Sequence, residues 1–196
     1  MKSVSLLALL FIGLFYAPLR KINWSSQRKL ATSDYRIIDP RKSQSLYGAE
    51  TYHKIKVDYS FDDSVLDYEV VTYFVPDSSW MKLYTGRQLT ASEAAINTCQ
   101  HTRGLQHEQG HFDLSEVYAR KIRRTFQNFR LHKNEDSLTA SIRQLLSRMT
   151  RAEKQYDAAT LHSQDSLAQA AWSNNIDLML DTLKSCENTK GSVLLK

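Results

Sequence analysis

Hydrophobic and polar residues alternate most regularly over residues 54–61 (KIKVDYSF). A period of two residues is typical of a β-strand with one face in water. Residues 66–75 follow and are rich in β-branched and aromatic side chains, which also favour a strand, and Pro76 ends this segment. With residues 62–64 as the turn, the pattern predicts an antiparallel hairpin.

Three later segments carry apolar residues at the spacing of three to four that is typical of a helix with one buried stripe. They span residues 105–129, 138–156 and 167–183. Residues 90–102 look helical as well, whereas residues 157–163 are expected to break the chain between the last two helices. Gly191 is expected to lie in a short polar tail.

The rest of the chain carries weaker signals. Residues 22–50 are polar with scattered aromatic residues and predict an irregular lead-in with one short strand, and a further extended segment is expected at Trp80. A chain of 196 residues is most simply one domain, placed here at residues 22–190. The elements together predict an α+β fold, in which a small antiparallel sheet packs on the helix at 105–129 and two further long helices follow.

The N-terminal residues 1–21 are typical of a targeting segment. Lys2 gives a positive end, residues 4–17 are almost wholly apolar, and Arg20 and Lys21 close the segment. This apolar run is shorter than the about 20 residues that a membrane-spanning helix needs. The cleavage site is poorly marked, so a signal peptide and an uncleaved anchor stay open as alternatives. Either predicts an exported protein, periplasmic or extracellular, that meets a membrane only through residues 4–17.

The amino-acid composition excludes few classes of protein function. Hydrophobic residues make up 42%, charged residues 24%, and the net charge is +5, as in an ordinary globular domain. The densest basic run, Arg120 to Arg124, is interpreted as the solvated face of a helix, and no nucleic-acid partner is expected. The two cysteines, Cys99 and Cys186, do not form a Cys-x-x-Cys pair, which excludes a cysteine zinc site. A disulfide and two free thiols both stay open.

The strongest chemical signal is His107-Glu108-Gln109-Gly110-His111. On a helix His107 and His111 lie one turn apart on the same face, so both imidazoles can reach one metal ion. Glu108 lies beside them and can act as a base towards metal-bound water, as in zinc metalloproteases. Such a site also needs a third ligand and an open fourth position. Gly110 costs about 1 kcal/mol relative to Ala in a helix, which suggests that substrate or chain passes close to it.

The third ligand is not fixed by spacing. Asp113 and Glu116 lie about 200° and 140° around the helix from His111, so they are expected near the ligands or in solvent rather than on the metal. His101 would need a sharp bend to reach the site, and His132 lies in an exposed-looking loop.

His162 falls between two long helices, where a chain reversal can bring it over the motif helix. Tyr156 and Asp157 are the kind of neighbours that orient a ligand by hydrogen bonds, and Asp113 is a further candidate for this role. Tyr118 and Tyr156 are candidates for stabilising an oxyanion, with packed, half-buried tyrosines as the alternative.

The motif helix, residues 107–121 (HEQGHFDLSEVYARK), resembles that of a bacterial family known as domain of unknown function 922, described as predicted secreted zinc-dependent proteases. Further similarity lies at these positions: residues 24–35, Ser79-Trp80, Tyr156-Asp157, Thr160, His162, Gln169 and Trp172. Residues 31–33 depart from the family, which usually carries a tryptophan there. The resemblance implies a zincin-like α+β fold, a secretory signal and His162 as the third zinc ligand.

These residues predict an exported zinc metallopeptidase acting on a peptide or protein substrate. Zn²⁺ would be held by His107, His111 and His162, and Glu108 would pass a proton from water to the leaving amine. A strand around residues 66–75 or Trp80 is expected to hold the extended peptide by strand addition. The alternative is an exported zinc-binding or structural protein without turnover, whose site is closed by a fourth protein ligand or a blocked pocket.

Overall fold

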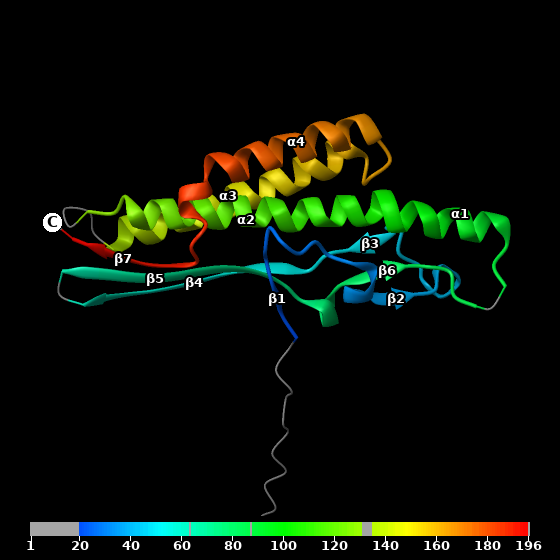
Figure 1. Cartoon of the computed structure of the whole chain (residues 1–196), viewed down its shortest axis with the longest axis horizontal. Coiled ribbons are helices and arrows are strands. Elements are labelled where there is room, and N and C mark those ends of the chain that lie inside the picture. Colours follow the sequence, from blue (N-terminus) through cyan, green and yellow to red (C-terminus); the bar gives the residue numbers. More distant parts are fainter. Residues whose placement is uncertain (1–19, 63, 87, 131–134, 196) are drawn as a thin grey trace, which may run out of the picture.

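A computed structural model describes residues 20–62, 64–86, 88–130 and 135–195 (Figure 1). Long helices form one side of the molecule and β-strands the other, which confirms a mixed α+β fold with small sheets and long helices. Residues 1–19 of the expected targeting segment, and His132, lie outside the described residues. Within those ranges, none of the helices combines the length and the apolar character that a membrane crossing requires.

The larger sheet is built on the expected hairpin. Strands β4 (His53–Asp62) and β5 (Val65–Phe74) pair antiparallel over their full length, as their alternating pattern predicts. On the other side of β5, β1 (Ile22–Asn23) pairs with its end and β7 (Lys190–Leu194) with its beginning. The prediction that Gly191 lies in a polar tail is therefore wrong, because backbone hydrogen bonds of β7 complete the sheet.

A second, three-stranded sheet comes from the segment expected to be irregular. Strands β2 (Arg36–Ile38) and β3 (Ala49–Glu50) lie on either side of β6 (Trp80–Lys82), β2 parallel to it and β3 antiparallel. Both β5 and β6 are thus paired on two sides. The expectation that one of them offers a free edge to a peptide is wrong, and β2 and β3 are the edge strands of this sheet.

The helices match the expected segments, and short 3₁₀ turns lie between other elements. The helices are α1 (Ala91–Cys99), α2 (Leu105–Gln127), α3 (Glu135–Thr160) and α4 (Ser166–Thr182). A π-helical turn, Gln100–Gly104, joins α1 to α2. The 3₁₀ turns are Thr32–Asp34, Pro40–Lys42, Pro76–Ser78 and Lys184–Cys186. Because α3 runs to Thr160, the expected break begins later than predicted, and Asp157 lies on a helix.

Helix α2 lies between the larger sheet and the pair α3 and α4 (Figure 1). Its apolar side packs on β5, where the Phe126 ring stacks on Tyr68 with 4.8 Å between ring centroids. Because α2 is covered on several sides, its polar residues must find partners inside the protein. The interpretation of Arg120 to Arg124 as a solvated face is wrong for Arg120 and Arg123, which are buried and pair with Glu116.

Candidate metal centre

The two motif histidines lie one turn apart on α2, as their spacing predicts. The rings of His107 and His111 are perpendicular, with 4.9 Å between their centroids. Tyr156 of α3 holds both: its ring stacks on His107 at 4.6 Å and meets His111 edge-on at 4.9 Å. One aromatic ring therefore limits the rotation of both imidazoles, which is the preorganisation that a metal site needs.

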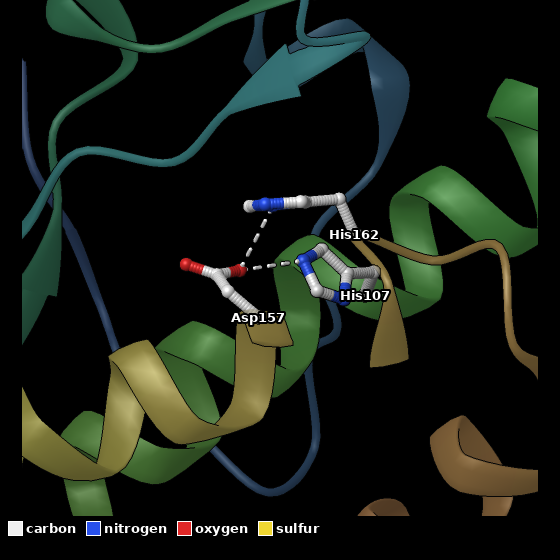
Figure 2. Close-up of side chains that lie close together, drawn as sticks. All are labelled: His107, Asp157 and His162. Carbon is white, nitrogen blue, oxygen red and sulfur yellow. Dashed lines mark hydrogen bonds and ion pairs between the residues drawn. The ribbon is translucent and has the colours of Figure 1, made fainter. Parts of the chain in front are cut away.

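Helix α3 and the turn after it bring two further donors to the same place. Asp157 lies on the last turn of α3, and His162 on the turn that follows; Figure 2 shows both beside His107. Leu161, His162 and Ser163 have backbone φ angles of 49°, 50° and 73°, a left-handed conformation that costs non-glycine residues about 1–3 kcal/mol each. Such strain is typical of functional sites, and here it turns His162 back towards α2.

One carboxylate oxygen is the point at which the three histidines meet. Asp157 Oδ1 lies 3.1 Å from His107 Nε2, 3.0 Å from His111 Nε2 and 3.5 Å from His162 Nδ1. The donor atoms of His107, Asp157 and His162 all lie within 4.8 Å of one another. His111 joins this group through its contact with Asp157.

The charges in the cluster change the protonation of its members. Burial would raise the pKa of Asp157, but hydrogen bonds with His107 and His111 hold that pKa well below its usual range. Burial likewise would lower the pKa of His111, yet the Asp157 hydrogen bond and the charge of Glu108 raise it. The cluster is thus an anionic carboxylate surrounded by imidazoles, which favours a cation among them.

A chain of hydrogen bonds fixes the tautomer of His107. The Tyr156 hydroxyl donates to the His107 backbone oxygen at 3.0 Å and accepts from Gln169 Nε2 at 2.7 Å. The Gln169 amide must therefore turn its oxygen, Oε1, to His107 Nδ1, which lies 3.2 Å away. Nδ1 carries the proton, so a neutral His107 presents the lone pair of Nε2 to the cluster, as a metal ligand does.

This donor set fits a zinc ion. The lone pair of His107 Nε2 and the Asp157 carboxylate are both hydrogen-bond acceptors, and they lie 3.1 Å apart. Two acceptors this close need a cation between them, either a proton or a metal ion. Imidazole nitrogens and a carboxylate oxygen are ligands that zinc accepts. Two ligands of one zinc ion, each bound at about 2.0 Å, are about 3.3 Å apart in a tetrahedral site, close to the separations found here.

Gly110 is explained by a close contact with Tyr156. A Cβ atom at position 110 would lie 2.2 Å from the Tyr156 hydroxyl oxygen. The sequence suggested that substrate or chain passes close to this glycine, and the neighbour is a side chain that orients the motif histidines. The cost of glycine in α2 is thus offset by the packing of Tyr156 against His107.

Glu108 faces an open pocket beside this cluster. The pocket has a volume of about 960 Å³ and is lined by α2, α3, the turn at His162 and the edge strand β3. Glu108 is only 6% exposed, and its carboxylate forms no hydrogen bond or ion pair with the described residues. Its oxygens are not fully enclosed but face the pocket, so this carboxylate is available for chemistry there.

Several predicted site residues lie elsewhere. Asp113 accepts hydrogen bonds from Trp24, Lys29 and Gln109, which ties α2 to the N-terminal segment rather than to the cluster. Tyr118 lines a different cavity between α2 and α3. The Tyr156 hydroxyl is already bonded on both sides, so Tyr156 orients the histidines and its hydroxyl is not free for an oxyanion.

Other features of the pocket were not predicted from the sequence. Asp157 was expected to orient a ligand, but its carboxylate contacts the Nε2 atoms of His107 and His111 directly. On the pocket wall, His53 of β4 pairs with Glu153 of α3 at 2.9 Å. No local motif marks this pair, because it forms only when the hairpin meets α3. Both cysteines are free thiols: Cys99 lines the pocket, and Cys186 is buried.

Comparisons with known proteins supply no relative. A scan against models of protein families, a search of curated proteins and a search of solved structures each found no match. The function must therefore be argued from the site.

Proposed function

We propose that this protein is a zinc metallopeptidase with a zincin-like site, acting after export. The observation that carries the proposal is the Glu108 carboxylate, which faces the pocket without a hydrogen bond or ion pair to the described residues, beside a cluster of three histidines. A site that serves only to hold the fold together has no use for a free base in an open pocket. The proposal also accords with the resemblance to the family known as domain of unknown function 922.

The residues have distinct roles in this proposal. His107, His111 and His162 hold the ion, and Tyr156 and Gln169 keep the first of them in the ligating tautomer. Zinc bound there would act as a Lewis acid and lower the pKa of water to about 7. Glu108 accepts the proton of that water and later gives it to the leaving amine.

The edge strand β3 is the proposed binding place for the substrate. Residues 46–51 border the pocket, and β3 is paired with β6 on one side only. An extended peptide can add to such an edge through backbone hydrogen bonds, which selects for chain conformation more than for side chains. The substrate class is therefore an extended or unfolded peptide segment.

Asp157 supports a second candidate function. If its carboxylate were a fourth zinc ligand, the site would be closed and would serve structure or binding without turnover. The contacts of 3.0 to 3.5 Å between Asp157 and the three histidines favour this alternative. The peptidase proposal instead treats Asp157 as a counter-charge that gathers the imidazoles before the metal binds.

Zinc content and peptide cleavage together distinguish the peptidase, the closed structural zinc site and a site that binds no metal. The purified protein is expected to hold one zinc ion per chain and to cleave a quenched fluorescent peptide library. His162→Ala should weaken zinc binding at least 100-fold, whereas Asp157→Asn should weaken it about tenfold or less. The measurements are metal analysis and competition with a chelator.

A larger loss of zinc in Asp157→Asn than in His162→Ala would make Asp157 the ligand. Zinc at one per chain without any cleavage would favour the structural function. If the parent protein takes up no zinc at all, both proposals fail.

Gln169→Leu tests the hydrogen-bond chain independently. Leu cannot accept a hydrogen bond from His107 Nδ1–H, which leaves only the Thr160 hydroxyl at 3.3 Å beside that atom. The tautomer is then held less firmly, and zinc affinity is expected to fall about 10- to 100-fold. The exposed Gln144 on α3 offers the matched control, since Gln144→Leu makes the same change away from the site. Equal zinc affinity in the two variants, measured by chelator competition, would show that Gln169 does not orient His107.

A further inference from the structure

The basic run of α2 divides into two pairs with different surroundings. Arg120 and Arg123 are buried against Glu116, whereas Lys121 and Arg124 line a cavity of about 500 Å³ between α2 and α3. Arg148 of α3 lines the same cavity. This basic cavity, defined by Lys121, Arg124 and Arg148, shares no lining residue with the pocket at Glu108.

The positive charge of the basic cavity is not compensated by the described protein. No aspartate or glutamate is among the described residues that line it, and its three cations form no ion pair with a described carboxylate. Lys121 instead lies over the Tyr118 ring, 4.3 Å from its centroid. Burial and the charges of Arg124 and Arg148 lower the pKa of Lys121, which shows how closely the like charges lie. A bound anion would relieve this repulsion.

The remaining lining adds an apolar surface to this charge. Phe129, Leu138, Leu145 and Asn128 also line the cavity. Phe129 and Leu138 belong to the core, so this surface is held in place by the packing of α2 on the larger sheet. A simple inorganic anion would contact only the three cationic side chains. An ester of an oxyanion could contact these cations and the apolar lining together.

We propose that the basic cavity binds a phosphate ester whose organic group is apolar. The guanidinium groups of Arg124 and Arg148 can each donate two hydrogen bonds to phosphate oxygens, and Lys121 adds a point charge. The organic group would contact Leu145, the half-buried leucine of the lining, because Leu138 and Phe129 are almost fully buried. Such an ester could be a soluble molecule or the headgroup region of a phospholipid. This site is separate from the proposed peptidase centre and does not depend on it.

Calorimetric titration of the full chain with 1-naphthyl phosphate tests the site. Binding with one molecule per chain is expected, and it should weaken as salt is added. Lys121→Gln and Arg148→Gln should each weaken it about tenfold, because each removes one charge-assisted contact. Arg143→Gln is the matched control, since Arg143 is an exposed arginine on α3 that does not line the cavity. Circular dichroism checks that each variant is folded.

Vesicles distinguish the two sources of the ester. Flotation with phosphatidylglycerol vesicles, compared with phosphatidylcholine vesicles, would identify a lipid headgroup if it depends on Lys121 and Arg148. Binding of 1-naphthyl phosphate without vesicle binding would identify a soluble ester. The proposal is overturned if neither probe binds up to about 10 mM, well above the Kd of a weak specific complex. It is also overturned if Arg143→Gln weakens binding as much as the cavity variants do.

Discussion

Glu108→Gln is expected to lower the rate of peptide hydrolysis about 10²- to 10⁴-fold while the protein keeps one zinc ion per chain. Gln has nearly the same size and shape as Glu but cannot accept a proton from water. Because Glu108 forms no hydrogen bond or ion pair with the described residues, its replacement removes no contact that holds α2. The measurement is kcat with a quenched fluorescent peptide, together with metal analysis of the same sample.

The matched control is Glu153→Gln in the wall of the same pocket. Glu153 already pairs with His53, so its role is to hold the wall, and a loss of less than about tenfold is expected. An active Glu108→Gln enzyme that holds zinc would remove Glu108 from the proposed chemistry. Loss of zinc from Glu108→Gln would instead place this carboxylate among the metal ligands.

The parts of the fold that follow from local pattern could be predicted. The alternation over residues 54–61 predicted the hairpin, and the spacing of apolar residues predicted the helices α2, α3 and α4. Strands of two residues, such as β1 and β3, have no period to detect, and their pairing depends on distant segments. Gly191 shows the same limit, because its place in β7 is set by β5, far away in the sequence.

The candidate site likewise has a part that local sequence predicts and a part that depends on packing between distant segments. His107, Glu108 and His111 are neighbours on one helix, so their spacing alone predicted a shared face. His162 was singled out by its place between two long helices, and its role as the third ligand was implied only by the family resemblance. The direct contact of Asp157 with His107 depends on α3 continuing to Thr160, one turn beyond the expected end of this helix. Helix ends are weakly encoded in local sequence, since tertiary packing often decides them.

The pattern of charged residues was the least reliable predictor of which side chains are exposed to solvent. A run of basic residues after an apolar stripe is typical of a solvated helix face. In this protein α2 is covered by the sheet on one side and by α3 and α4 on others, so two of those arginines are enclosed. Their burial is possible because Glu116, four and seven residues before them, supplies the counter-charge.

Glu116→Ala is expected to lower the free energy of unfolding by about 3–5 kcal/mol, which corresponds to a fall of about 10 °C or more in melting temperature. The Glu116 carboxylate accepts from Arg120 at 3.0 Å and from Arg123 at 2.7 Å. Both guanidinium groups also donate to backbone oxygens of other elements, Arg120 to Leu180 and Arg123 to Val70. Removing the carboxylate leaves Arg123 buried without a paired carboxylate and Arg120 with only its weaker contact of 3.6 Å to Glu187.

The control for this prediction is Asp136→Ala, which removes an exposed carboxylate from the first turn of α3 and should change stability by less than about 1 kcal/mol. A double-mutant cycle tests the cause. When Arg123 is already replaced by Met, Glu116→Ala should cost clearly less, because one of the two buried cations is gone. Equal costs in both backgrounds would mean that Glu116 acts through packing and not through its charge. Thermal and urea unfolding, followed by circular dichroism, measure the cost of Glu116→Ala in both backgrounds.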